Sequence, residues 1–179
     1  MIIEDSNFLG EEHKKYIKDV ILSEDFSWYH QNDTVDPNDF NVVTNKKTYF
    51  CHTVLRRLED RKIGETYNSP HAPFCIDVLN KFCSKNNIKY KEILRIAFNL
   101  TYNCGYEKCD VHEDHEYDHC QLLVYLNNFN KDLKTVVQND KEEIKIKPDL
   151  YKGIFFDNKP HYHYFPKQGV RVVMITTFR

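Results

Sequence analysis

Two stretches in the first half of the chain carry apolar residues at helical spacing. In residues 10–22, the side chains that share one helical face are Tyr16, Ile17, Val20 and Ile21. A second helix is indicated by Ser69 as its N-cap and Pro70 at its first position, and we expect it to stop at Asn86-Asn87. The first pattern predicts a surface helix that packs on something flat, and both helices are expected to support the strands that follow.

After the second helix, the pattern changes to short β-rich runs separated by polar turns. The predicted strands cover residues 93–102, 121–126, 143–146, 153–156 and 170–178. An earlier strand is expected at Tyr49–Leu55, after a loop at residues 32–45. Helices followed by a run of strands predict an α+β, mainly β fold: a double-stranded β-helix (cupin-like jelly roll) buttressed by the N-terminal helices. We expect one domain over residues 1–179, with a helical and mixed part at 1–92 and the jelly-roll core at 93–179.

The composition is typical of a single folded domain. Of 179 residues, 41% are hydrophobic and 14% aromatic, which argues against a disordered chain. The net charge of -2 gives no global field that would hold nucleic acid or an anionic membrane. Four cations form either a solvated face or a local basic patch: Arg56, Arg57, Arg61 and Lys62. No apolar run reaches the roughly 20 residues that span a bilayer, and no signal-peptide pattern is present, so we expect a cytoplasmic protein with reduced cysteines.

The main chemical signal is the sequence His112-Glu113-Asp114, followed by a distant His161. Side chains two positions apart on an extended strand return to the same face, so His112 and Asp114 can bind one metal ion. His161 can then complete a set of three ligands. Two imidazoles and one carboxylate on one face of an octahedral ion leave three positions open, an arrangement that suits iron(II) and dioxygen chemistry.

Arg171 lies ten residues after His161, in an apolar strand. Its neighbours Val170, Val172 and Val173 predict burial on both faces, where an unpaired guanidinium would be costly. The residue therefore needs an anionic partner. A guanidinium set back from the metal can bind the far carboxylate of a dicarboxylate cosubstrate whose other end chelates iron. The alternative is an ordinary ion pair with a surface carboxylate.

Two alternatives concern the metal itself. His163 would share a strand face with His161, so either histidine can supply the third ligand. A structural zinc site is the competing metal hypothesis, because thiols and imidazoles cluster around the first ligands. They are Cys104, Cys109, His115, His119 and Cys120. The paired Cys-x2-Cys spacing that is typical of zinc sites is absent from this cluster.

Five motifs follow one another along the chain. They are Tyr102 and Gly105 before the His112-x-Asp114 pair, the run Val124-Tyr125-Leu126-Asn127, the run from Lys147-Pro148 to Phe155-Phe156-Asp157, the pair Pro160-His161, and Gly169-x-Arg171. In this order and spacing, residues 94–178 resemble the catalytic core of the 2-oxoglutarate- and iron(II)-dependent dioxygenases, in the prolyl-4-hydroxylase-like branch. The N-terminal part resembles small oxygenases of phages and other viruses.

The resemblance implies roles for individual residues. It assigns 2-oxoglutarate binding to Tyr102, Tyr125 and Arg171, and it favours His161 as the third ligand because the family's ligand directly follows a proline. One departure is that the family often has Gly-Gly-x-Thr after the tyrosine strand, whereas this chain has Asp132-Leu133-Lys134-Thr135. The departure affects the loop that helps to shape the substrate entrance.

The implied function is that of an iron(II)- and 2-oxoglutarate-dependent dioxygenase. Such an enzyme uses O2 to hydroxylate an unactivated C–H bond and releases succinate and CO2, with ascorbate as an optional cofactor. The branch favours a peptidyl, prolyl-type substrate; the alternative is the same chemistry on a nucleobase, a free amino acid or a small metabolite, with nucleic acid less favoured. The alternative class is a non-catalytic cupin-like domain that binds a metal or ligand. A viral relative would act in the host cytoplasm.

Overall fold

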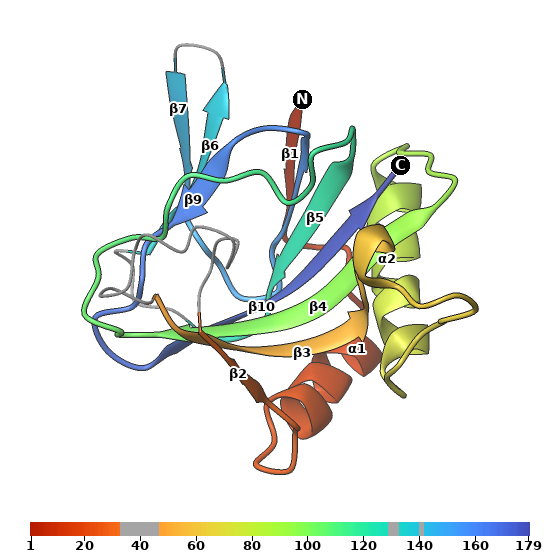
Figure 1. Ribbon diagram of the computed structural model, residues 1–179, viewed down its shortest axis with the longest axis horizontal. Coiled ribbons are helices and arrows are strands. Elements are labelled where there is room, and N and C mark those ends of the chain that lie inside the picture. Colours follow the sequence, from red (N-terminus) through yellow and green to blue (C-terminus); the bar gives the residue numbers. More distant parts are fainter. Residues whose placement is uncertain (33–46, 129–132, 140–141) are drawn as a thin grey trace.

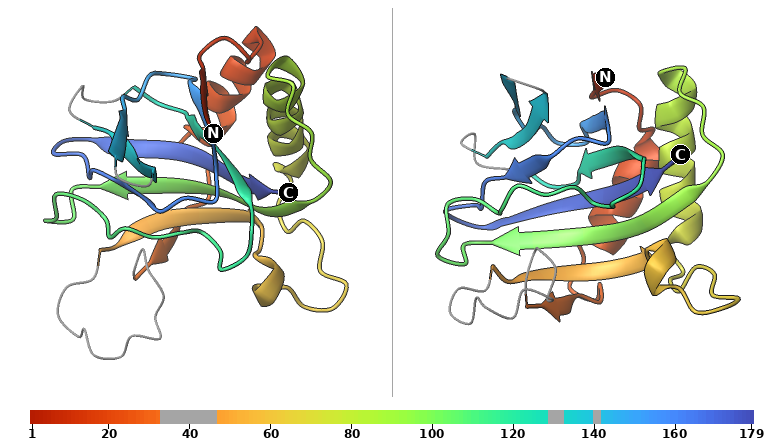
Figure 2. Two further views of the ribbon diagram at one scale, coloured as in Figure 1. Left: turned by 90° about the horizontal axis from the view of Figure 1, so that it is seen from above. Right: turned by 45° about the horizontal axis from the view of Figure 1, so that its top comes forward.

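The computed structural model describes residues 1–32, 47–128, 133–139 and 142–179. Within them, two antiparallel sheets face each other, and helices cover the outer face of the larger sheet (Figures 1 and 2). The larger sheet has the strand order β1-β8-β5-β10-β4-β3-β2, and the smaller sheet has the order β7-β6-β9.

The bounds of the elements follow the chain. The strands are β1 (Ile2–Asp5), β2 (Tyr29–Gln31), β3 (Tyr49–Leu55), β4 (Ile93–Tyr102), β5 (Cys120–Tyr125), β6 (Thr135–Asn139), β7 (Glu142–Ile146), β8 (Gly153–Asp157), β9 (His161–His163) and β10 (Val170–Phe178). The helical elements are α1 (Glu11–Tyr16), the wider helical turn η1 (Ile17–Ile21), the tight turn η2 (Leu58–Asp60) and α2 (Ala72–Lys85). None of the described helices combines the length and the apolar character needed to cross a bilayer.

Side-chain alternation gives the larger sheet two different faces. Along β4, the even-numbered residues are mainly apolar, while the odd-numbered ones include Arg95, Asn99 and Thr101. Successive side chains of a strand point to opposite faces, so one face is hydrophobic and the other carries polar groups. The neighbouring strand β10 follows the same rule, because Arg171 pairs with Thr101 and Val173 pairs with Asn99. The polar positions line the space between the two sheets.

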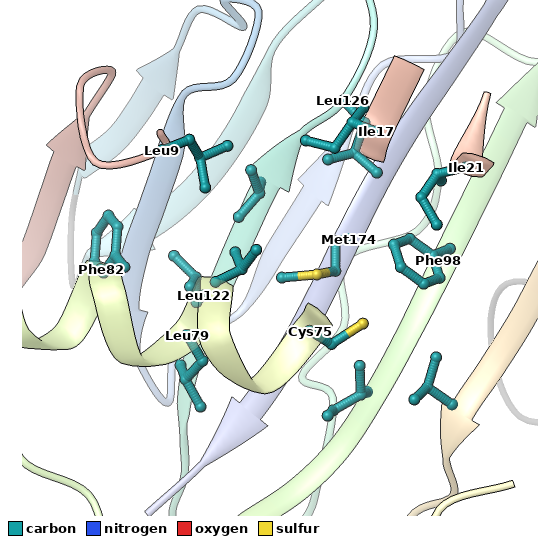
Figure 3. Close-up of a cluster of buried hydrophobic side chains, with 14 of the residues drawn as sticks. Leu9, Ile17, Ile21, Cys75, Leu79, Phe82, Phe98, Leu122, Leu126 and Met174 are labelled. Carbon is teal, nitrogen blue, oxygen red and sulfur yellow. The ribbon is translucent and has the colours of Figure 1, made fainter. Parts of the chain in front are cut away.

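The apolar face packs against α1, η1 and α2 and forms the main core (Figure 3). Its fully buried side chains include Ile17, Ile21, Leu79, Phe82, Phe98, Leu122 and Met174. The first helical segment therefore has the flat partner that its sequence pattern predicts, and α2 packs on the same face of the sheet. A second, smaller cluster lies between the sheets and consists of Leu123, Tyr125, Val137, Ile146, Ile154, Phe156, Val173 and Ile175.

The strand predictions are largely confirmed. The strands at 93–102, 170–178 and Tyr49–Leu55 have the predicted bounds, and β5, β7 and β8 agree with the prediction to within one residue at each end. The mainly β character with few helices is confirmed. The double-stranded β-helix and the division of the chain at residue 92 stay predictions. The predicted loop at residues 32–45 lies, apart from residue 32, outside the described residues.

The start of the second helix is corrected by the structure. Helix α2 begins at Ala72, with His71 as its N-cap. Ser69 does not cap it, because the Ser69 hydroxyl accepts a hydrogen bond from the His71 backbone N–H and contacts His52 Nε2 at 2.8 Å. Residues 69–71 therefore form a turn before the helix. The predicted end is correct, since Asn86 is the C-cap and Asn87 has a φ of 57°.

Gly153 offers a test of how tightly the main core is packed. A Cβ at this position would lie 2.8 Å from Phe82 Cε2 and 2.9 Å from Phe8 Cε1. The two rings are buried and meet edge to face at 5.0 Å between centroids, so neither can easily move away. We expect Gly153→Ala to lower the free energy of unfolding by about 1–3 kcal/mol, measured by urea denaturation.

The control for this prediction is a double-mutant cycle with Phe82→Leu. The smaller side chain relieves the contact, so the alanine at position 153 should cost less in the Phe82→Leu background. An equal cost in both backgrounds would show that the clash with Phe82 is not the cause.

Candidate metal centre

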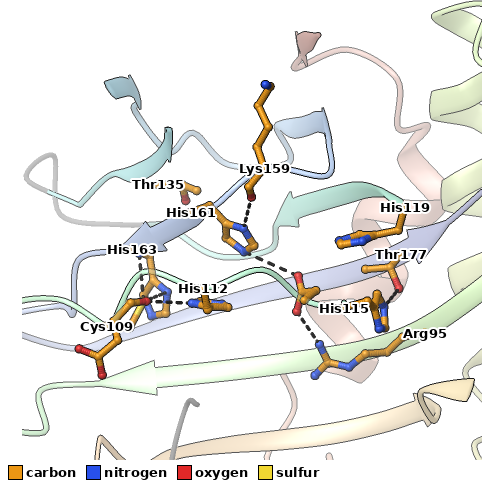
Figure 4. A network of polar contacts seen from close by, with 12 residues as sticks. Arg95, Cys109, His112, His115, His119, Thr135, Lys159, His161, His163 and Thr177 are labelled. Carbon is orange, nitrogen blue, oxygen red and sulfur yellow. Dashed lines mark hydrogen bonds and ion pairs between the residues drawn. The ribbon is translucent and has the colours of Figure 1, made fainter. Parts of the chain in front are cut away.

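His112 and His161, which are distant in sequence, lie side by side between the two sheets (Figure 4), and Asp114 lies next to His161. His112 and Asp114 lie in the segment between β4 and β5, and His161 begins β9. An isolated backbone bridge joins the two histidines: the His112 N–H donates to the His161 carbonyl at 3.0 Å, and the His161 N–H donates to the His112 carbonyl at 2.9 Å. The imidazole centroids are 4.5 Å apart, and Asp114 Oδ2 lies 3.6 Å from His161 Nε2.

Each histidine is oriented by a backbone carbonyl. His112 Nδ1 lies 2.9 Å from the Asp110 carbonyl oxygen, and His161 Nδ1 lies 3.1 Å from the Lys159 carbonyl oxygen. A carbonyl can only accept, so in both rings Nδ1 carries the hydrogen. The neutral tautomer then leaves the Nε2 lone pair free for a metal, as in many metal-binding histidines.

The two imidazoles differ in how easily they are protonated. Burial lowers the pKa of His161 to about 4, so this ring is neutral and ready to bind a cation. Burial also acts to lower the pKa of His112, but contact with Cys109 and the charge of Asp114 outweigh it and raise the pKa to about 9. A metal ion at this site would therefore displace a proton from His112.

Asp114 is buried and has one carboxylate oxygen to spare. Arg95 donates to Asp114 Oδ1 at 3.1 Å, and the Arg57 guanidinium lies 3.9 Å from the same oxygen. In the described part of the chain, Asp114 Oδ2 has no hydrogen-bond partner. Burial acts to raise the pKa of this carboxyl group, but His161, Arg95 and His112 outweigh it and hold the pKa well below the usual range. The group is therefore an anion whose free oxygen faces the two histidines.

The donor set fits a divalent ion such as iron(II). Two ligand atoms at about 2.1 Å from one octahedral ion lie about 3 Å apart, and the Oδ2–Nε2 distance of 3.6 Å is only slightly longer. Among the described residues, no three His, Cys, Asp or Glu side chains are already closed around a common point. Small side-chain rotations of this triad would be needed to close it on an ion.

The thiols and imidazoles that the zinc hypothesis groups together have separate hydrogen-bond partners in the structure. Cys109 Sγ lies 3.1 Å from His163 Nδ1, while His115 Nε2 lies 2.7 Å from Thr177 Oγ1. His119 Nδ1 bonds to a backbone carbonyl. All six cysteines are free thiols. The arrangement of the described residues thus gives no support to a zinc cluster.

The other two predicted residues of this region, Arg171 and Tyr125, lie together. Arg171 is buried, and one of its Nη atoms donates to Thr135 Oγ1 at 3.3 Å. The guanidinium carbon lies 5.7 Å from the centroid of the Tyr125 ring, and the Tyr125 hydroxyl donates to the same Thr135 oxygen at 2.7 Å. No described carboxylate forms an ion pair with Arg171, so the ordinary surface ion pair is not observed. The residue is a buried cation that a carboxylate ligand would neutralise.

Tyr102 is the predicted residue that the structure does not bring to this place. It is an even-numbered residue of β4, its hydroxyl contacts Thr48 Oγ1 at 2.6 Å, and its ring lies beside Phe50. Among the described residues, neither Tyr102 nor Tyr125 lines the cavity between the sheets, whereas Tyr49 of β3 does; Tyr125, unlike Tyr102, lies beside Arg171. Sequence reasoning missed Tyr49 and Arg95. Arg95 carries the same signal as Arg171, a charged residue inside an apolar strand.

The wall of the cavity is unusually polar. It contains buried atoms that have no hydrogen-bond partner within the described ranges: Asn99 Oδ1, Thr101 Oγ1, the Gln121 amide, Asp114 Oδ2 and His163 Nε2. Buried polar groups in folded proteins nearly always have partners. Unpaired groups that converge on one cavity indicate that the space accommodates polar ligands or water.

Comparison with known proteins gives fold relatives. No family model matches the chain, and no curated protein matches it. A 2OG-Fe(II) oxygenase family oxidoreductase from Burkholderia pseudomallei superposes with a TM-score of 0.73 at 11% identity, covering 99% of this chain and 84% of that one. A Trichoplax adhaerens prolyl hydroxylase in complex with a hypoxia inducible factor peptide gives 0.65 at 13% identity, with coverages of 99% and 82%. The viral collagen prolyl hydroxylase of Paramecium Bursaria Chlorella virus-1 gives 0.56 at 14% identity, with coverages of 98% and 94%. The chain therefore has the fold of the 2OG-Fe(II) oxygenase family proteins, among which are prolyl hydroxylases.

Proposed function

We propose that this protein is an iron(II)- and 2-oxoglutarate-dependent dioxygenase that hydroxylates an unactivated C–H bond, on a peptidyl, prolyl-type substrate. His112, Asp114 and His161 would hold the iron, and Arg171 with Tyr125 would hold 2-oxoglutarate. The observation that carries the proposal is two buried charged groups on one cavity wall, each with an unfilled position for a ligand. They are Asp114, whose Oδ2 atom lies beside His161 without a hydrogen-bond partner among the described residues, and the Arg171 guanidinium, for which the described residues offer no carboxylate.

The residues around these charges have separable tasks. Arg95 holds Asp114 Oδ1, which leaves Oδ2 directed at the metal position. The carbonyls of Asp110 and Lys159 keep the Nε2 atoms of His112 and His161 free. Arg171 and Thr135 would bind the far carboxylate of the cosubstrate through charge-assisted hydrogen bonds. O2 is the oxidant; iron(II), when bound, would activate it, and the decarboxylation of 2-oxoglutarate to succinate would supply two of the four electrons that O2 accepts.

A peptide substrate is supported by one fold relative. The Trichoplax prolyl hydroxylase was solved with a peptide fragment. A free amino acid or another small metabolite is the alternative, and the polar side chains of Asn99, Thr101 and Gln121 on the cavity wall suit a substrate with several hydrogen-bonding groups.

A nucleic-acid substrate receives less support. The basic patch does not form one binding face at the cavity, because Arg56 pairs with Glu65 at 3.0 Å and Arg61 donates to the backbone carbonyls of Ile93 and Leu94. Arg57 is the member of this patch that lines the cavity in the described structure.

Succinate release tests the proposal. We expect the protein with iron(II), 2-oxoglutarate and O2 to form succinate slowly without substrate, and faster with the correct one. The screen compares proline peptides, free amino acids and single-stranded DNA, and mass spectrometry detects one added oxygen atom in the product. An elimination, epimerisation or ring closure in place of oxygen insertion would remove the hydroxylase assignment and keep the oxygenase class.

The alternative class is a non-catalytic metal- or ligand-binding domain. It would be favoured if iron(II) and 2-oxoglutarate both bind but no succinate forms with any member of the screen. Failure of 2-oxoglutarate to bind to the iron-loaded protein would contradict the proposal outright.

A further inference from the structure

His163 occupies a defined place relative to the candidate metal ligand His161. The two residues are two positions apart on β9, so they share a face and their Cα atoms are about 6.8 Å apart along the strand. Cross-strand pairing places His163 opposite Thr135 of β6. Directly opposed residues on neighbouring strands have Cβ atoms about 5 Å apart. His163 therefore lies next to Thr135, on the far side from the metal position.

Thr135 connects this histidine to the buried guanidinium. Arg171 donates to Thr135 Oγ1 at 3.3 Å, and all three side chains line the same cavity. The His163 Nε2 atom is buried, and in the part of the chain that the structure describes it has no hydrogen-bond partner. Figure 4 shows His163 and Thr135 on one side of His112 and His161, with Arg95 on the other side. A guanidinium, a hydroxyl group and an unpaired imidazole nitrogen thus meet at one end of the cavity.

The other side of the His163 ring is fixed by Cys109. Cys109 Sγ lies 3.1 Å from His163 Nδ1 and accepts the His163 backbone N–H at 3.2 Å (Figure 4). The thiol is buried, so it is shielded from water that could compete for these bonds. The same sulfur also forms a hydrogen bond with the His112 imidazole. Because the sulfur acts as an acceptor toward this ring and toward the backbone, its own hydrogen can be donated to His163 Nδ1. In that arrangement Nδ1 is an acceptor, and the neutral ring carries its hydrogen on Nε2.

We propose that His163 is a positioning residue for the cosubstrate: its Nε2–H donates to the same distal carboxylate that Arg171 binds, and the Cys109 thiol sets the required tautomer. This inference rests on the proposed function, since it assumes that a dicarboxylate chelates the metal at one end and reaches Arg171 at the other. It assigns to His163 a role other than that of third metal ligand. It also gives a task to Cys109, one of the thiols that the sequence left unexplained.

The other neutral tautomer of His163, with its hydrogen on Nδ1, would lead to different hydrogen bonds. If Nδ1–H donated to the sulfur, Nε2 would be an acceptor and would repel a carboxylate. It would then be expected to accept a hydrogen bond from the neighbouring guanidinium, and no such bond is present between the described side chains. The absence of a partner at His163 Nε2 therefore favours the tautomer with its hydrogen on Nε2, which can donate to an anionic ligand.

The tautomer can be measured without any turnover. In protein with ¹⁵N-labelled histidine, His163 should show a protonated Nε2 and an unprotonated Nδ1, assigned by comparison with the His163→Gln variant. Cys109→Ala should change this pattern, and Cys109→Ser should keep it, because a hydroxyl group can donate in place of the thiol. Nδ1 protonation in the unsubstituted protein would overturn the role assigned to Cys109.

Cosubstrate affinity provides the second readout. By calorimetry with the manganese(II)-loaded protein, we expect His163→Phe to weaken 2-oxoglutarate binding by about tenfold or more, the typical effect of losing one hydrogen bond to a charged group. Affinity for manganese(II) alone should stay within about twofold. Cys109→Ala should weaken 2-oxoglutarate less, and Cys109→Ser should recover most of the loss. Cys120→Ala, which alters a thiol on β5 outside the cavity lining, is the matched control.

The outcomes separate this inference from the proposed function. If 2-oxoglutarate does not bind to the unsubstituted metal-loaded protein, the proposed function itself fails. If it binds, and binds equally well to the folded His163→Phe and His163→Gln variants, the role of His163 is wrong while the oxygenase assignment stands. Loss of manganese(II) binding in both variants would instead make His163 a metal ligand and overturn the inference.

Discussion

Asp114→Ala should remove stable iron(II) binding. The substitution deletes the one anionic ligand of the triad, whose Oδ2 atom lies 3.6 Å from His161 Nε2 and has no partner among the described residues. Loss of a residue that merely orients a ligand typically weakens metal binding by about 10–100-fold, so loss of the ligand itself should exceed about 100-fold. Under anaerobic conditions, iron(II) and 2-oxoglutarate should give a weak visible charge-transfer band with the unsubstituted protein and none with this variant. His112→Ala and His161→Ala should behave in the same way.

Two controls make this result specific. His30→Ala changes an exposed histidine on β2 and should leave the band intact. Asp114→Ala also leaves Arg95 buried without its carboxylate, which could destabilise the fold. The double variant Asp114→Ala/Arg95→Met removes that charge, and it should unfold at a denaturant concentration closer to that of the unsubstituted protein while still lacking the band. A full band in folded Asp114→Ala protein would place the metal elsewhere.

Arg171→Ala should raise the 2-oxoglutarate concentration needed for half-saturation by about 10–100-fold or more, because hydrogen bonds to a charged group are worth about 1.5–3 kcal/mol each. The guanidinium is buried, contacts Thr135, and forms no ion pair with any described carboxylate. It does not contact the metal triad directly, so iron(II) affinity should change by no more than a few-fold. Titration of the charge-transfer band with 2-oxoglutarate, and separate titration with iron(II), distinguishes the two effects.

The matched controls for Arg171 test geometry and charge separately. Arg171→Lys keeps the charge but loses the planar fork that binds a carboxylate through two hydrogen bonds, so its affinity for 2-oxoglutarate should be intermediate. Arg179→Ala removes an exposed arginine that pairs with Glu92 at the surface and should have no effect on either titration. Equal losses of iron and cosubstrate binding in Arg171→Ala would contradict the assigned role.

The sequence predicted the long elements well because their patterns repeat over many residues. Strand β4 alternates between an apolar face and a face that carries Arg95, Asn99 and Thr101, and β10 is a long, mainly apolar run that contains Arg171. Three strands that the sequence did not predict, β1, β2 and β6, have three to five residues each, and β9 was anticipated only as the strand face that His161 and His163 would share. So short a run has no measurable period, and the pairing partner determines whether it is extended. Strand β9 depends on its pairing with β6 and on the bridge between His161 and His112.

The sequence predicted those site residues whose type and immediate neighbours already indicate a chemical role. The spacing of His112 and Asp114 and the charge of Arg171 inside an apolar strand are such signals. The sequence does not indicate which face of a strand a tyrosine side chain occupies. Tyr102 and Thr101 are adjacent on β4, and a shift of one position separates the cavity side from the helix side. In the structure, the tyrosine that lines the cavity at this end of the sheet is Tyr49. The contact between Tyr102 and the cosubstrate stays a prediction.

The backbone bridge between His112 and His161 has a consequence for how the protein can release a bound ion. The two candidate ligands His112 and His161 are joined by a pair of reciprocal backbone hydrogen bonds. The backbone of neither residue can move away without breaking these hydrogen bonds. Fraying of the segment between β4 and β5 and loss of the ion would be a single cooperative event. A bound ion would thus crosslink the segment between β4 and β5 to β9 across the cavity. Without the ion, local unfolding of the protein would begin at this cavity.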